Sequence, residues 1–183
     1  SITFGQSLSD EENVPYFTNQ LLKKDYNVYN YAFNGYGPHQ FLSKMRNLKY
    51  KEIEKCNNLI FIYQFIYDHI ARVVGKRSWG DKSPRFKIEN NKLIQKGFFS
   101  NFPFKIIMKI RKNFRHSKVS NLIYNLDNIS YKDITIFLSI LKNIEFEAKN
   151  HFKNVNFVYL VWDTNLDEKI NITQFFESRN SIF

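Results

Sequence analysis

Short runs of apolar residues alternate along most of the chain with segments in which apolar residues recur every three or four positions. The two longest runs, at 59–66 and 155–162, are typical of strands that are buried on both faces of a parallel sheet. A shorter apolar run at 28–32 predicts a third strand. Because strands that alternate with helices form parallel sheets, the pattern predicts a three-layer α/β/α fold. In this fold a doubly wound, flavodoxin-like parallel sheet contains the three strands as neighbours and has helices on both faces.

The segments between the runs predict helices, and two of these begin with a capping signal. Ser9 precedes Glu12 by three residues, and Ser130 precedes Asp133 by the same spacing, so that each pair can satisfy the first backbone amides of a helix. The predicted helices span residues 9–24, 39–50, 104–125 (as one helix or two), 130–148 and 172–183.

Residues 72–128 interrupt this alternation. Turn residues such as Gly80, Asn90 and Asn91 divide the segment and predict loops with a hairpin around Phe86–Phe98. The chain is therefore interpreted as one incomplete domain, residues 1–183, with an insertion at about 72–128. Because the insertion follows the strand at 59–66, we expect it to pack beside the carboxyl ends of the strands and to shape access to a substrate.

The net charge of +10 is concentrated in one part of the chain. Residues 72–118 hold fourteen Lys or Arg and two Asp or Glu, whereas the remainder is slightly acidic. A basic segment can bind an anionic membrane or a nucleic acid, but Lys, Asn and Ile make up about a third of this chain, and a solvated surface is the favoured explanation of the charge. No nucleic acid is expected, because the aromatic-glycine signatures of RNA-binding modules are absent. Peripheral membrane contact stays open, with Phe104–Arg115 as its segment.

Several protein classes are excluded by composition. A single cysteine, Cys56, rules out an internal disulfide framework, and the apolar runs are too short to span a bilayer. The chain opens at Ser1 without an initiator methionine and looks as if it were cut from a longer one. The sequence assigns no compartment.

Candidate chemistry is sought in the turns that follow the predicted strands, because ligands of α/β folds bind at the carboxyl ends of the strands. The opening segment, Ser1-Ile-Thr-Phe-Gly5 followed by Ser9 to Pro15, resembles the start of the SGNH (GDSL-type) hydrolases just after the Gly-Asp pair of their Gly-Asp-Ser motif. The resemblance implies that Ser1 is the catalytic nucleophile. It also implies that the Gly-Asp pair and the first strand lie upstream, so that the domain is truncated at both ends.

A second motif supports the same family. The segment Asn30-Tyr-Ala-Phe-Asn-Gly-Tyr-Gly-Pro38 is similar to the family's strand that ends in a glycine-bearing loop. The resemblance implies that the backbone amides of Ser1 and Gly35 donate to the oxyanion, and that Asn34 is near the substrate. Asn34-Gly35 is also a common turn pair, so an ordinary turn glycine remains the alternative at this position.

The third motif departs from the family pattern. Where the family has Gly-x-Asn-Asp, this chain has Phe65 to Arg72, with Tyr67 in place of the asparagine if Asp68 keeps the aspartate. His69 is the candidate for the missing oxyanion donor, since some diverged members carry a similar Asp-His-x-x-Arg run. Gln64 is the alternative if the register shifts.

Asp68 and Arg72 accompany His69 as candidate substrate-contacting residues. The competing interpretation is that Asp68, His69 and Arg72 form a structural charge cluster at the start of the insertion. The sequence leaves these two interpretations open.

The family's general base is missing from the sequence. Its Asp-x-x-His motif does not occur in the 183 residues, and Asp163 lacks a histidine three positions on. His39, which opens a helix near the site, is interpreted as a surface histidine, and His116 and His151 lie away from the site. The chain as given is therefore expected to be inactive. No spacing resembles a metal site or a phosphate-binding loop, so no metal or cofactor is expected.

The sequence thus favours a serine esterase or acyl hydrolase acting on an ester-linked acyl group, for example of a small molecule, a glycan or a lipid. The alternative is a catalytically inactive SGNH-like binding module whose basic insertion contacts an anionic membrane or a nucleic acid.

Overall fold

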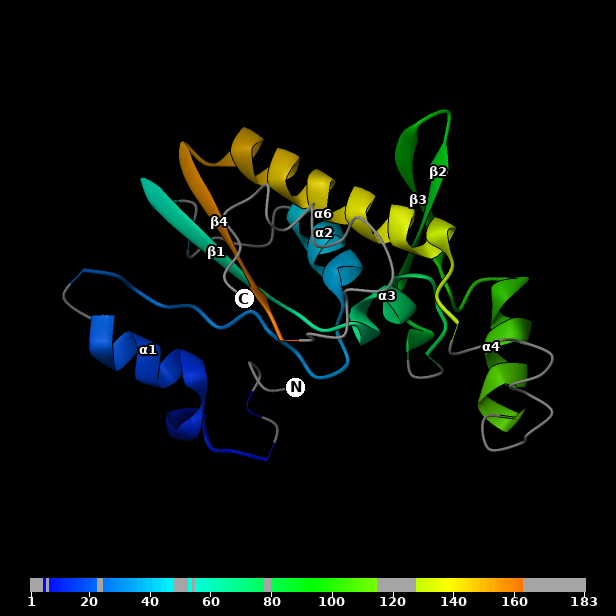
Figure 1. The fold of residues 1–183 in the computed structure, drawn as a ribbon, viewed down its shortest axis with the longest axis horizontal. Coiled ribbons are helices and arrows are strands. Elements are labelled where there is room, and N and C mark those ends of the chain that lie inside the picture. Colours follow the sequence, from blue (N-terminus) through cyan, green and yellow to red (C-terminus); the bar gives the residue numbers. More distant parts are fainter. Residues whose placement is uncertain are drawn as a thin grey trace. The chain divides into compact units, whose positions relative to one another are not determined.

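A computed structural model gives the fold of the chain (Figure 1). It forms two compact units, Ser1–Tyr36 (unit 1) and Gly37–Phe183 (unit 2), and each is described by itself. The structure describes residues 5, 7–22, 25–47, 53, 55–77, 80–114 and 128–162. The predicted helix at 172–183 lies outside these residues.

Unit 1 begins with two short helical segments instead of the one predicted helix. Glu12 accepts a hydrogen bond from the backbone N–H of Ser9 at 2.9 Å, and this contact supports the 3₁₀ helix η1 (Asp10–Glu12). Helix α1 (Val14–Leu22) has a cap of its own, because Asn13 Oδ1 accepts from the N–H of Tyr16 at 2.9 Å. The predicted capping box therefore exists, but it serves the segment before the main helix.

The predicted strand at 28–32 is wrong, since this segment has no regular secondary structure. The side chain of Asn19 accepts from the N–H of Val28 at 3.1 Å, and that of Asn30 accepts from the N–H of Ala32 at 3.1 Å. Asparagine side chains thus bind backbone amides that a strand would offer to its neighbour. Apolar content alone did not reveal this competition.

Unit 2 contains a parallel pair of strands, which confirms the central part of the predicted fold. Strand β1 (Asn58–Phe65) pairs with β4 (Asn154–Val161), and Asn58 lies opposite Asn154 at one end and Phe65 opposite Val161 at the other. The two strands are almost a hundred residues apart in the sequence. Their pairing makes the chain an α/β protein with parallel strands.

Helices cover one face of this pair. Phe61 contacts Phe41 of α2 (Pro38–Arg46) with ring centres 5.8 Å apart, and Phe65 contacts Phe137 of α6 (Tyr131–His151) at 5.2 Å. Alternate residues of a strand point to the same face, so Tyr63 lies on this covered face as well. The predicted cap of α6 is present, since Ser130 Oγ accepts from the N–H of Asp133.

The opposite face of the pair is exposed. The exposed fraction is 46% for Ile60, 60% for Ile62 and 60% for Trp162, which follows β4. The sequence predicts strands that are buried on both faces, and within the described residues only one face is covered. The structure therefore shows an α/β arrangement with one helical layer on the sheet, and the three-layer fold is not established.

The insertion contains the predicted hairpin. Strands β2 (Pro84–Glu89) and β3 (Lys92–Phe98) pair antiparallel around a turn in which Asn90 and Asn91 have φ of 50° and 60°. Both values lie in the left-handed region that asparagine tolerates well and that two-residue hairpin turns require. The hairpin packs on α2 and α6.

Two further helices are among the described residues of unit 2. Helix α3 (Asp68–Val73) starts three residues after β1, and helix α4 (Phe104–Phe114) follows the hairpin. The predicted helix at 104–125 is present as far as Phe114, and residues 115–127 lie outside the described part. Among the described helices, none is both long enough and apolar enough to cross a bilayer.

Candidate functional site

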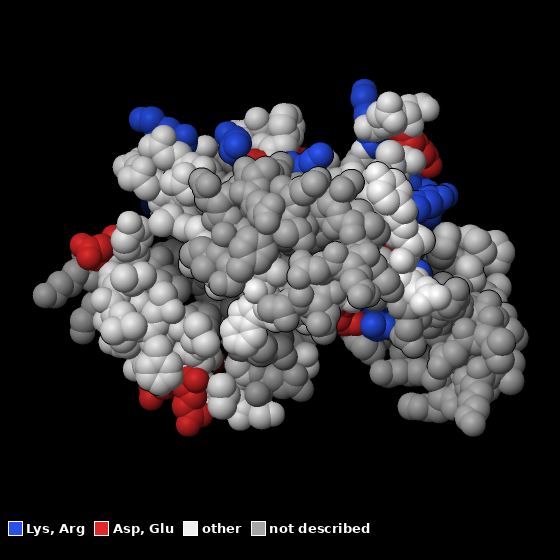
Figure 2. All heavy atoms as spheres, in the orientation of Figure 1, with Lys and Arg blue, Asp and Glu red and all other residues white. Residues whose placement is uncertain are grey.

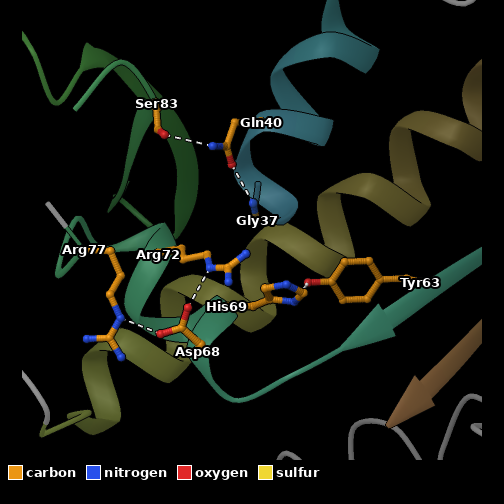
Figure 3. A network of polar contacts seen from close by, with 8 residues as sticks. All are labelled: Gly37, Gln40, Tyr63, Asp68, His69, Arg72, Arg77 and Ser83. Carbon is orange, nitrogen blue, oxygen red and sulfur yellow. Dashed lines mark hydrogen bonds and ion pairs between the residues drawn. The ribbon is translucent and has the colours of Figure 1, made fainter. Parts of the chain in front are cut away.

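Polar side chains converge where β1 ends and α3 begins (Figure 3). Tyr63 comes from β1, Asp68, His69 and Arg72 come from α3, and His39 comes from the first turn of α2. We call this group the α3 cluster. Helix α3 is anchored by its apolar residues Ile70, Ala71 and Val73, which are buried, and its polar residues are thereby held at the carboxyl end of β1.

Asp68 is bound by two arginines. Its carboxylate accepts from Nε of Arg72 at 2.7 Å and from Nε of Arg77 at 2.5 Å. Burial alone would raise the pKa of Asp68, but the hydrogen bonds from the two guanidinium groups outweigh burial and hold this pKa below its usual range. The carboxylate is therefore ionised, and the three side chains together carry one excess positive charge.

His69 turns away from this ion cluster and meets Tyr63. Its Nδ1 lies 2.7 Å from the Tyr63 hydroxyl. Burial, and next the positive charge of Arg72, lower the pKa of His69 to about 3, although Asp68 acts in the opposite direction. Burial also raises the pKa of Tyr63 well above its usual value. Both groups are thus neutral over the physiological pH range.

His39 is buried, which corrects its interpretation as a surface histidine. Its exposed fraction is 1%, and neither ring nitrogen has a hydrogen-bond partner among the described residues. Burial lowers the pKa of His39 to about 3, with smaller contributions from His69 and Arg72. A second neutral imidazole therefore lies next to the first.

Gly37 makes room for the His39 ring. A Cβ atom at this position would lie 3.0 Å from Nδ1 of His39 and 3.4 Å from Cβ of Arg72, so a side chain here would displace the ring or the helix. Gln40 then fixes the start of α2. It accepts from the Gly37 N–H at 2.8 Å and donates to Ser83 Oγ at 2.8 Å (Figure 3).

The Gln40–Ser83 contact also locates the insertion. Ser83 directly precedes β2, and its partner Gln40 is in the same helical turn as His39. On the other side, Lys76 binds Asp133 at 2.7 Å and so joins the end of α3 to the start of α6. The base of the hairpin therefore lies near the carboxyl end of β1, and a role of the insertion in shaping access to a substrate stays a prediction.

The structure brings together some of the residues predicted for the site. Asp68, His69 and Arg72 are neighbours: Asp68 and Arg72 form an ion pair, as the charge-cluster interpretation predicts, whereas His69 bonds to Tyr63. Their contact with a substrate stays a prediction. Gln64, the alternative donor, lies next to Tyr63 on β1, where successive side chains point to opposite faces of the sheet.

The other predicted site residues belong to unit 1. Ser1 lies outside the described residues. Gly35 has a φ of +75° in a turn that is closed by a hydrogen bond from the Tyr36 N–H to the Phe33 carbonyl at 3.2 Å, and only glycine adopts this backbone conformation freely. Asn34 is exposed in the same turn.

Sequence reasoning missed two members of the α3 cluster, Tyr63 and His39. The alternation of side chains in β1 was a usable signal for Tyr63, since it places the hydroxyl on the face of Phe61 and Phe65 near the end of the strand. The signal for His39 was weaker, because the space for its ring comes from the absence of a side chain at Gly37, and a glycine in a turn does not by itself indicate this.

The α3 cluster can donate hydrogen bonds to an oxygen that carries negative charge. Together with Arg77 it combines a net positive ion cluster with two neutral imidazoles, one buried at His39 and one part-buried at His69, and donors act more strongly where water is scarce. Within the described residues, no three His, Cys, Asp or Glu side chains are arranged to hold a metal ion.

Comparisons of the chain with models of protein families, with curated proteins and with solved structures found no match. The resemblance to SGNH hydrolases therefore rests on the motifs in the sequence.

Proposed function

We propose that the protein is an SGNH-type serine hydrolase that cleaves an ester-linked acyl group. The observation that carries the proposal is the position and state of His69. It is neutral, it is held by Tyr63 at the carboxyl end of β1, and it lies beside the positive charge of Arg72. The family resemblance requires a third oxyanion donor after this strand, and a neutral imidazole N–H is a suitable one.

In the proposed reaction, the Ser1 hydroxyl attacks the ester carbonyl and its proton passes to a general base. The carbonyl oxygen becomes an oxyanion, which the backbone amides of Ser1 and Gly35 and the N–H of His69 stabilise. The alcohol leaves with a proton from the base, and water then hydrolyses the acyl-enzyme. In the SGNH hydrolases that the chain resembles, the base is the histidine of an Asp-x-x-His motif, and these 183 residues contain no such motif.

His69 is suited to the role of donor and not to the role of base. A general base must accept a proton near neutral pH, whereas the pKa of His69 is lowered to about 3. The same holds for His39. These low pKa values support a site in which both imidazoles stay neutral while charge develops on the substrate.

The proposal includes the fuller fold of the family, a doubly wound sheet with helices on both faces. The exposed apolar side chains of Ile60, Ile62 and Trp162 support it, because such a face on a sheet is normally covered by a further layer. No helical layer on this face is among the described residues of unit 2.

Replacement of Ser1 tests the proposal in the full-length protein. We expect Ser1→Ala to abolish hydrolysis of a small activated ester such as p-nitrophenyl acetate while the circular dichroism spectrum stays unchanged. Ser139→Ala is a matched control on α6, far from the predicted nucleophile in sequence, and it should keep full activity. If the Ser1→Ala variant still hydrolysed the ester, Ser1 would not be the nucleophile.

The basic insertion supplies less support for the alternative, a binding module. Figure 2 shows Lys and Arg side chains on the hairpin with acidic side chains beside them, and Glu89 pairs with Lys96 at 2.8 Å. On α4, Met108 is buried, and the Phe104 ring packs under the guanidinium of Arg85 at 4.2 Å. Part of the apolar side of α4 therefore packs against the fold and is not available to a lipid surface.

A further inference from the structure

Tyr63 and His69 share a hydrogen bond whose direction decides what His69 can do. The Tyr63 oxygen and His69 Nδ1 lie 2.7 Å apart, and either atom can be the donor. We propose that Tyr63 is a positioning residue that donates its hydroxyl hydrogen to Nδ1 of His69 and thereby keeps the ring in the tautomer that carries hydrogen on Nε2.

The first step of the argument is that His69 is neutral. A neutral imidazole has one nitrogen that donates and one that accepts. Burial and the nearby Arg72 disfavour the charged ring, and Asp68 does not offset them because its carboxylate is bound by Arg72 and Arg77. In the contact with Tyr63, Nδ1 is therefore the donor if it carries the hydrogen, and the acceptor if it does not.

The second step concerns the Tyr63 hydroxyl, which lies in a part-buried contact and remains protonated. If Nδ1 carried the hydrogen and donated to the Tyr63 oxygen, the hydroxyl hydrogen would need another acceptor. The rings that contact Tyr63 are those of His69 and Tyr159, and no second acceptor for the hydroxyl lies among the described residues. An enclosed O–H without an acceptor is costly, so the hydroxyl donates to Nδ1.

The consequence concerns Nε2, the other nitrogen of the His69 ring. With Nδ1 occupied as an acceptor, Nε2 carries the hydrogen and is a donor. The group it recognises is an oxygen acceptor, either a carbonyl or the oxyanion formed from it. The assignment of this acceptor to a substrate rests on the proposed function. The assignment of the His69 tautomer does not rest on it.

Tyr159 provides a matched control. It lies directly opposite Tyr63 in the register of β1 and β4, and its side chain is buried on the same face of the sheet. Its hydroxyl donates to Oε1 of Glu145 at 2.6 Å and not to a histidine. Loss of this hydroxyl removes a comparable hydrogen bond and leaves the Tyr63–His69 contact in place.

The experiment is a long-range ¹H–¹⁵N correlation spectrum of the histidine rings at neutral pH, in the unmodified protein and in the variants Tyr63→Phe and Tyr159→Phe. We expect the unmodified protein and Tyr159→Phe to show an unprotonated Nδ1 and a protonated Nε2 at His69. In Tyr63→Phe we expect averaged shifts from two exchanging tautomers. For ester hydrolysis by the full-length protein, we expect Tyr63→Phe to lower kcat about tenfold with KM nearly unchanged.

A protonated Nδ1 in the unmodified protein would overturn the inference, and this result needs no variant that might fail to fold. Unchanged ring shifts in Tyr63→Phe would also overturn it, because the tautomer would then have another cause. The expected spectra together with an active Ser1→Ala variant would support the role of Tyr63 and reject the proposed hydrolase. Failure of the inference and failure of the function are thus distinguishable.

Discussion

Two polar clusters in unit 2 are built from similar side chains but differ in how completely they are paired. Between α2 and α6, Arg46 donates from Nε to Glu147 at 2.8 Å and from Nη2 to Asn143 at 2.9 Å. In the α3 cluster, Asp68 is paired in a comparable way, yet the adjacent His39 is buried with both ring nitrogens unpartnered among the described residues.

The difference lies in whether every buried polar group has a partner. A paired cluster such as that of Arg46 contributes to stability, and its polar groups already have the hydrogen-bond partners that a ligand would otherwise supply. An unpartnered buried group costs about 1–3 kcal/mol, and native proteins keep few of them. An apolar residue at this position would avoid that cost, so His39 is the member of the α3 cluster at which the proposed function is best tested.

The largest expected effect is the response of the α3 cluster to acid. Unfolded histidine binds a proton below a pKa near 6.5, whereas burial keeps folded His39 and His69 neutral down to about 3. The unfolded state therefore binds more protons between these values, so stability is full above pH 6.5 and falls as the pH drops toward 3. Each group contributes a slope of about 1.4 kcal/mol per pH unit.

Urea unfolding at pH 7, 6, 5 and 4 measures this dependence. We expect the free energy of unfolding to fall by about 2–3 kcal/mol per pH unit below pH 6, and the slope to be roughly halved in His39→Leu. Asp68 and Asp133, whose pKa values are also lowered, add to the loss only near and below pH 4. A flat profile between pH 7 and pH 5 would show that the two histidines are not held neutral.

The next effect in size is on catalysis. Removal of one oxyanion donor costs about 3 kcal/mol, or roughly a hundredfold in kcat, so we expect this loss for His69→Ala in the full-length protein. Arg46→Met, in the paired cluster, should cost about 1 kcal/mol of stability and leave kcat within twofold. If both variants lost activity equally, the two clusters would not differ in function.

At His39 we expect a smaller effect, in which stability rises while activity falls. Replacement by leucine removes two unpartnered nitrogens from a buried site, so His39→Leu should raise the free energy of unfolding by about 1 kcal/mol at pH 7. If the α3 cluster serves the reaction, hydrolysis should fall at the same time, by about tenfold. Thermal melts and ester kinetics on one preparation give both numbers. If His39→Leu were less stable but fully active, His39 would be a core residue without a role in the reaction.

The strand pair shows what could be predicted from the sequence. The runs at 59–66 and 155–162 have no competing pattern, because their apolar side chains are continuous and their lengths match a strand. The hairpin was equally accessible, since Asn90 and Asn91 are residues that adopt the left-handed conformation its turn requires. In these regions local chemistry and tertiary packing favour the same structure.

The errors arose where a distant residue decides the outcome. The backbone at 28–32 is bound by asparagine side chains, one of them from Asn19 in α1, and a hydropathy pattern does not record such bonds. The space for the His39 ring depends on Gly37, and its neighbour Arg72 is more than thirty residues away in the sequence. The candidate site was therefore predictable as a location after β1, whereas the membership and protonation of its residues required the three-dimensional structure.

The smallest expected effect concerns the insertion and contact with membranes. On α4, Lys105 and Lys109 are exposed together with Ile106, but Phe104 and Met108 contact the rest of unit 2. One exposed isoleucine between two lysines gives little apolar area to insert, and attraction to an anionic surface is worth only about 1 kcal/mol per lysine. We therefore expect weak binding to vesicles of mixed neutral and anionic lipids.

Vesicle co-sedimentation at 150 mM salt, a concentration at which surface charges are screened within about 8 Å, measures this binding. The double variant Lys105→Glu/Lys109→Glu should change it by less than about twofold, as should the control Lys142→Glu/Lys149→Glu on the exposed side of α6. Strong binding that is lost in the α4 variant alone, and that weakens steeply with salt, would favour the binding module. The insertion would then carry the function, and the α3 cluster would be a relic of an ancestral site.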